Sequence, residues 1–143
     1  MTTLSEIYGD VIYAYTREQF IKDGGLVALS GPGSEVHDEW IPKMCDEEGF
    51  RVPVGMTAEA FALTVELSPK AEEAGCDLKG RLWDVLFMLR LAISRSRSGD
   101  SPLYFELYCV TSFVKPSLTR LKCVCGPDDD GELCLTIMLP NQD

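Results

Sequence analysis

One long helix constrains the fold of this chain more than any other feature of its sequence. Residues 80–93, GRLWDVLFMLRLAI, repeat apolar side chains at the spacing of an α-helix. An apolar stripe that covers an arc of about 120° comprises Leu82, Val85, Leu86, Leu89, Ala92 and Ile93. Trp83 and Phe87 lie elsewhere on the helix, on the same side as Arg90. We therefore expect other elements to cover the helix on two sides, with both Trp83 and Leu86 in the core.

The spacing of apolar residues changes from helical to strand-like after this helix. Residues 103–110, 118–125 and 132–139 alternate as strands do, and the turn 126–131 joins the last two. Such neighbouring segments predict an antiparallel meander, and we expect Leu133 and Ile137 to point inward. Because helices come first and strands last, the sequence predicts an α+β fold with helices packed on one face of the sheet.

The N-terminal half contributes shorter elements. Residues 7–15 and 26–29 are typical of short strands. Thr16 and Gln19 form a capping box at the start of a helix that Gly24-Gly25 ends. Further predictions are a helix from Pro42 to Glu48, a helix from Ala58 to Leu67 capped by Thr57, and a polar connection over 69–78.

The length of the chain favours one domain over residues 1–143. No apolar run approaches the roughly 18 residues of a membrane span. The first residues lack the basic and apolar regions of a signal peptide. We therefore expect a cytoplasmic protein without membrane contact, whose cysteines are reduced.

Negative charge is concentrated in the first half of the chain. The net charge is −10, and residues 1–80 hold 15 acids and 6 bases, which gives −9. Direct binding of nucleic acid is disfavoured, because such binding depends on neutralising phosphates with Lys and Arg. An acidic surface would attract a partner protein with a basic surface, or it would serve solubility alone. The candidate partner-binding residues are Glu35, Asp38, Glu39, Asp46, Glu47 and Glu48.

Two motifs resemble metal sites but lack the required spacing. Cys123 and Cys125 lie two apart on a predicted strand, whereas structural zinc sites use pairs that meet in a turn. The acidic run 128–130 before Gly131 resembles a calcium loop. However, Gly126 and Ile137 occupy the places of its first and last ligands. We therefore expect no metal and no cofactor.

No arrangement of residues in the sequence matches a known catalytic motif. The single histidine, His37, lies among carboxylates in a polar segment without an evident nucleophile. Asp84 lies within the long apolar helix, and Arg81 three residues earlier favours an ion pair with it. We therefore assign no catalytic residue. A small enzyme or metal-dependent hydrolase that uses Asp84 or the His37 cluster stays an alternative.

Several sequence blocks are similar to an uncharacterised family of short proteins carried on bacterial plasmids, phages and integrated elements. The blocks are VIYAYTREQ (11–19), GRLWDVL (80–86), LKCVCGP (121–127) and LTIMLP (135–140). Residues 30–46 depart from the pattern of that family. The resemblance implies an accessory protein of mobile DNA, and it implies no activity or catalytic residue.

Charge and resemblance together predict a non-enzymatic accessory protein of a mobile genetic element that acts by protein binding through an acidic surface. An inhibitor of a host defence system has this character, for example an anti-CRISPR or anti-restriction protein that mimics nucleic acid. A plasmid maintenance or regulatory protein that acts through protein contacts is a further alternative.

Overall fold

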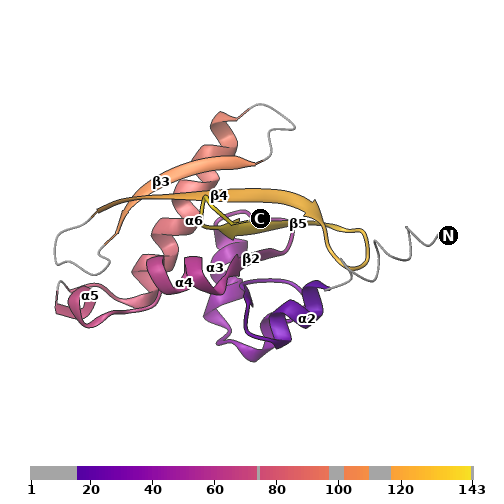
Figure 1. The fold of residues 1–143 in the computed structure, drawn as a ribbon, viewed down its shortest axis with the longest axis horizontal. Helices are drawn as coiled ribbons and strands as arrows, with labels where there is room; N and C mark the ends of the chain where they lie inside the picture. The colour runs from indigo at the N-terminus through magenta and orange to yellow at the C-terminus, as the bar shows by residue number, and fades with distance from the viewer. Residues whose placement is uncertain (1–15, 74, 97–101, 110–116, 143) are drawn as a thin grey trace.

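The chain folds into short helices, one long helix and a five-stranded sheet (Figure 1). This computed structural model describes residues 16–73, 75–96, 102–109 and 117–142. In chain order the elements are α2 (Arg17–Lys22), β1 (Leu26–Ala28), the 3-10 helix η2 (Ser34–Val36), α3 (Trp40–Glu47), β2 (Val54–Thr57), α4 (Ala58–Thr64), α5 (Pro69–Glu73), α6 (Leu78–Arg95), β3 (Leu103–Cys109), β4 (Ser117–Pro127) and β5 (Leu133–Met138). The strand predicted at 7–15 lies outside the described residues.

The sheet has the order β1-β2-β5-β4-β3 and is mostly antiparallel. Strands β3, β4 and β5 form the predicted antiparallel meander, so the α+β fold class is confirmed. β2 was not predicted; it pairs with β5 in parallel, with Met56 opposite Ile137, and with β1 antiparallel. All four residues of β2 are buried, so the strand shows no alternation of polar and apolar residues.

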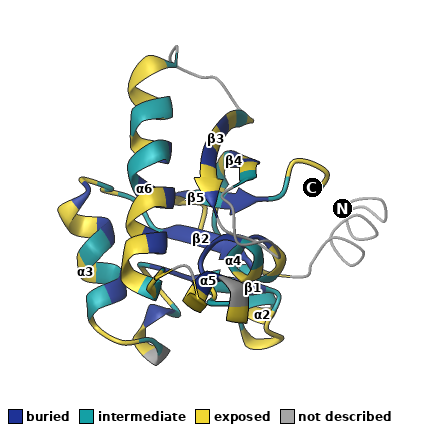
Figure 2. Cartoon of the chain, turned by 90° about the vertical axis from the view of Figure 1, so that its left-hand side faces the viewer, coloured by how far each residue is buried: buried dark blue, intermediate teal, exposed yellow. Residues whose placement is uncertain are grey.

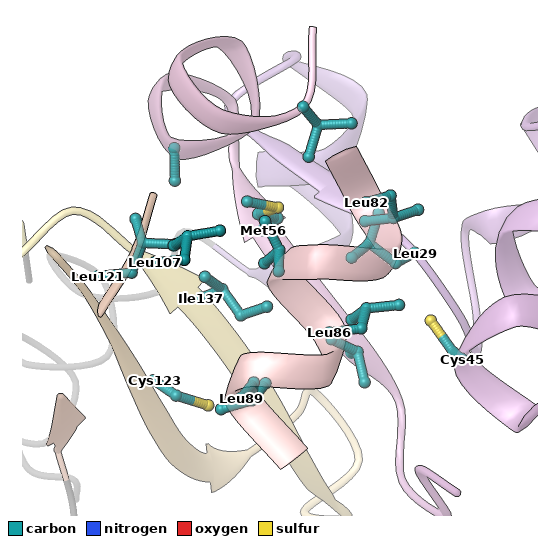
Figure 3. Close-up of a cluster of buried hydrophobic side chains, with 14 of the residues drawn as sticks. Leu29, Cys45, Met56, Leu82, Leu86, Leu89, Leu107, Leu121, Cys123 and Ile137 are labelled. Atoms are coloured by element: carbon teal, nitrogen blue, oxygen red, sulfur yellow. The ribbon is translucent and has the colours of Figure 1, made fainter. Parts of the chain in front are cut away.

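Helix α6 lies across one face of the sheet and buries the predicted apolar stripe there. Figure 3 shows Leu89 beside Cys123 of the sheet and Leu82 beside Leu29, in the core cluster that also holds Leu86 and Ile137. These leucines are fully buried, whereas Ile93 at the end of the stripe is 39% exposed. The prediction that Trp83 belongs to the core is wrong, because 42% of this residue is exposed. The side of α6 that carries Trp83 therefore has little cover.

The opposite face of the sheet is contacted by α2. Gly55 lies between two core residues of β2 and so faces away from α6. A Cβ atom at this glycine would come within 2.9 Å of Nη2 of Arg17, so the absence of a side chain lets α2 approach. On β5, Cys134 and Met138 are buried on this same face, and Leu133 is 52% exposed, contrary to the prediction.

Helix caps fix most of the helix starts. The Thr16 capping box and the Thr57 cap are present as predicted. Asp77 caps α6 by accepting a hydrogen bond from Gly80 N, so α6 begins earlier than expected. α3 begins at Trp40, which puts Pro42 within its first turn, and α4 ends at Thr64 instead of Leu67.

Candidate interaction surface

The predicted acidic residues lie in η2, in α3 and in the residues directly before and after α3, and Figure 2 shows α3 at one side of the molecule. Five of the six are exposed: Glu35, Asp38, Glu39, Asp46 and Glu47. We call these five residues the acidic surface. Glu35 also accepts a hydrogen bond from Gly33 N at 3.0 Å, which holds its carboxylate near the start of η2. Lys43 is the only lysine or arginine in residues 34–49, so the acidic surface is little neutralised by its own sequence.

The spacing of apolar residues in α3 directs its charges outward. Ile41 and Cys45 lie four residues apart and are both buried in the core. Lys43, Asp46 and Glu47 fall on the other side of the helix and are exposed. The acidic surface is therefore fixed to the core by the same helix that displays it.

Glu48 does not belong to this surface, which corrects the sequence prediction. The residue is only 4% exposed, and its Oε1 accepts a hydrogen bond from Nε of Arg90 at 3.0 Å. Arg90 lies on α6, and half of its side chain reaches solvent. Glu48 is the C-cap residue of α3. The ion pair therefore ties the end of α3 to α6.

His37 and its acidic neighbours do not assemble a metal site. Within the part of the chain that the structure describes, no group of three or more His, Cys, Asp or Glu residues could hold a metal ion. His37 is half-buried, while Glu35, Asp38 and Glu39 are exposed. The three carboxylates therefore contribute negative charge to the surface.

Asp84 is exposed, and Arg81 has a different main contact from the one predicted. Nη2 of Arg81 donates a hydrogen bond to the Leu63 carbonyl at 3.1 Å, near the C-terminal end of α4. A cation is favourable there because helix carbonyls at that end lack partners within the helix. Partial burial raises the pKa of Asp84, and the attraction of Arg81 opposes this to a smaller extent. Arg81 therefore acts mainly in packing α6 against α4.

The six cysteines are all free thiols, and most are buried. Burial raises the pKa of Cys45 to about 11 and that of Cys123 to about 12, and it also raises the pKa of Cys134. A thiol with a raised pKa stays protonated at neutral pH and is a poor nucleophile. Cys125 is exposed on β4, two residues from Cys123. Cys45, Cys123 and Cys134 therefore behave as small buried residues and not as catalytic groups.

The acidic hairpin between β4 and β5 has a structural role that the sequence analysis missed. Oδ1 and Oδ2 of Asp129 accept hydrogen bonds from the backbone N–H groups of Arg17 and Glu18, at 2.8 and 3.0 Å. Asp128 accepts from Asp130 N and Glu132 N within the turn. Asp129 thus caps α2 from a distant part of the chain, where a negative charge is favourable.

The outer face of β3 and β4 presents exposed aromatic and aliphatic side chains. Tyr108 and Leu118 are paired across the two strands and are 69% and 55% exposed. Arg120 lies over the ring of Tyr104, with its guanidinium carbon 4.4 Å from the ring centre. Alternation in the sequence separates the two faces of these strands, but it does not show which face lacks a cover.

Comparison with models of known protein families, with curated proteins and with solved structures finds no match to this chain. The described helices include none with both the length and the apolar character needed to cross a membrane.

Proposed function

We propose that this protein is a non-enzymatic binding protein that engages a partner with a basic surface through its acidic surface. The observation that carries the proposal is the exposure of Glu35, Asp38, Glu39, Asp46 and Glu47 together, on one helix and the segment before it. Like charges held close together repel one another, and a basic partner would relieve that repulsion. The net charge of −10 adds a long-range attraction that speeds encounter with such a partner.

The partner that we propose is a host protein whose basic surface normally holds nucleic acid, such as a defence effector. Carboxylates on a rigid helix can occupy a groove that binds phosphates, because both present closely spaced negative charge. We further propose that the chain is an accessory protein of a mobile genetic element, as its sequence blocks suggest, and an inhibitor of host defence fits that origin. A plasmid maintenance or regulatory role would use the same acidic surface with a different partner.

The enzymatic alternative has less support. In residues 16–73, 75–96, 102–109 and 117–142, the cysteines with shifted pKa values are all held as thiols. Asp84 sits beside Arg81, whose Nη2 donates a hydrogen bond to the Leu63 carbonyl, and neither residue is a nucleophile paired with a base.

A pair of charge-reversal variants tests the proposal. Asp46→Lys/Glu47→Lys changes the acidic surface, and Glu66→Lys/Glu132→Lys makes the same change in net charge at exposed sites elsewhere. Host-cell proteins captured by the wild type and by both variants are compared by quantitative mass spectrometry. We expect one host protein to be captured by the wild type and by Glu66→Lys/Glu132→Lys, but not by Asp46→Lys/Glu47→Lys.

Kinetics and competition with that partner complete the test. We expect the first variant to slow association by about tenfold at low salt with a smaller change in dissociation, because exposed charges act mainly on encounter. Adding the wild-type protein should displace labelled nucleic acid from the partner. If no captured protein distinguishes the two variants, the acidic surface serves solubility and the proposal fails.

A further inference from the structure

Among the strands that the structure describes, β3 lies at one edge of the sheet. It is the last strand in the order and pairs with β4 alone among the described strands. In an antiparallel pair, every second residue directs its N–H and C=O away from the partner strand. The seven residues Leu103–Cys109 therefore present a row of backbone donors and acceptors to whatever lies beyond the edge.

A groove runs along this edge, between β3 and the facing side of α6. It consists of three open cavities of about 440, 340 and 200 Å³. The first two share Met88 and Glu106 in their linings, and the last two share Asp84 and Tyr108. Because neighbouring cavities share lining residues, they follow one another along the strand, and we call them together the β3 groove. Figure 2 shows α6 between α3 and β3, so the groove and α3 lie on either side of α6.

The walls of the β3 groove are largely apolar. Helix α6 contributes Phe87, Met88 and Leu91, and these side chains are only partly buried. On the strand, Phe105 and Leu107 face the core beside them. An added strand places alternate side chains on one face, so its apolar residues would fill this groove while its backbone pairs with β3.

The middle of the groove is acidic and aromatic. Asp84 and Glu106 line the central cavity together with Tyr108, while Arg95 and Arg81 line the two neighbouring cavities. On the outer face of the strand, Tyr104 and Tyr108 flank Glu106 two residues away on either side. Arg120 already stacks on Tyr104, so this face accommodates a guanidinium over an aromatic ring. Glu106 is already opposite Arg120 on β4, and the same cross-strand preference favours a Lys or Arg side chain on a strand added at the other side of Glu106.

A second copy of the chain fits this edge poorly. Antiparallel pairing of β3 with itself about Glu106 would bring the two Glu106 carboxylates directly opposite each other, which is destabilising. Each copy also carries a net charge of −10, which adds repulsion between them.

We propose that the β3 groove binds an extended basic peptide segment of a partner protein as an additional strand of the sheet. The segment has the pattern apolar–basic–apolar. Its Lys or Arg lies opposite Glu106, and the flanking apolar side chains enter the groove beside Phe105 and Leu107. This inference does not depend on the acidic surface of α3, since it rests on different residues on the other side of α6.

Selection of short peptides from a random displayed library on the full-length protein tests the pattern. We expect enriched peptides to carry the apolar–basic–apolar alternation. For the best synthetic peptide, methylation of alternate backbone nitrogens should abolish binding in one register and spare it in the other, because only every second N–H bonds to the edge. Peptides that bind regardless of methylation would dock through side chains alone and would overturn strand addition.

Variants separate this proposal from the function proposed above. Glu106→Lys should weaken binding of the selected peptide by at least about fivefold and favour a peptide with Glu in place of the basic residue. Glu47→Lys makes the same charge change on the acidic surface and should leave peptide affinity unchanged. Tyr108→Ala, which changes an exposed side chain, should also weaken binding of the basic peptide. If no peptide is enriched, the groove binds no peptide and the proposal fails. If sedimentation shows a dimer that Glu106→Lys dissociates, the occupant is a second copy of the chain and the proposal also fails.

Discussion

Three buried ionisable groups in this protein illustrate two ways of avoiding an unpaired charge. Glu48 is buried and paired with Arg90, whereas Cys45 and Cys123 are buried as neutral thiols. A buried charge costs free energy unless a partner offsets the loss of hydration, while a thiol avoids that cost by keeping its proton. The two cases predict different responses to mutation and to pH.

Removal of the partner of Glu48 should destabilise the protein more than removal of the pair. We expect Arg90→Ala to lower the free energy of unfolding by about 3 kcal/mol, because it leaves a buried carboxylate without its cation. Adding Glu48→Gln to that variant should restore part of the loss. Urea unfolding of wild type, both single variants and the double variant measures the coupling. If the losses of the two single variants simply add up in the double variant, the ion pair contributes no coupling free energy to stability.

The raised thiol pKa values predict a loss of stability at alkaline pH. Cys45 and Cys123 titrate near 9.0 when unfolded but at about 11 and about 12 when folded. Above pH 9 the unfolded state loses protons that the folded state keeps. Their contribution to stability is therefore complete below pH 9 and decreases as pH rises toward the folded values. Urea unfolding between pH 8 and pH 10 should show a smaller decrease for Cys45→Ala than for wild type. Cys123→Ala should likewise show a smaller decrease than wild type.

At the scale of elements, α6 connects most of the molecule. Its buried side contacts the sheet and, through Arg81, α4, while Arg90 on its exposed side reaches Glu48 at the end of α3. Trp83 and Phe87 lie off the buried side, and Phe87 carries Arg90 over its ring at 5.3 Å. The helix therefore acts as the central support of the fold and also as one wall of the β3 groove.

Two truncations on α6 should differ in their effect on stability. We expect Leu86→Ala to cost about 3 kcal/mol, because it removes a fully buried side chain and leaves a cavity. Trp83→Ala should cost about 1 kcal/mol or less, because this side chain is 42% exposed. Chemical unfolding of the two variants compares the same helix and the same replacement residue. A larger loss for Trp83 would mean that the tryptophan packs more closely than its exposure indicates.

At the scale of the whole molecule, the acidic surface and the edge strand β3 occupy different places. The acidic surface lies on α3, and the edge strand lies on the other side of α6. Because α6 and the core connect the two, both can be occupied at once by different parts of a partner, or by two partners. Acidic residues elsewhere have local roles, as Asp77 and Asp129 show by capping helices.

The sequence by itself determined the features that depend on near neighbours. The buried stripe of α6, the antiparallel meander, and the caps at Thr16 and Thr57 all follow from residue spacing within a few positions. The exposure of five of the six candidate acidic residues also follows from their polar, locally amphipathic segment.

Tertiary structure alone decided what depends on residues far apart in the chain. Residues 54–57 form the strand β2 because they pair with β5 on one side and β1 on the other. A buried strand of four residues has no local pattern from which it can be predicted. Glu48 is buried instead of exposed because Arg90, 42 residues away in the chain, pairs with it where α3 meets α6. Asp129 caps a helix 111 residues away for the same kind of reason. Which strand is left at the edge is likewise a property of sheet order, and that order placed β3 there.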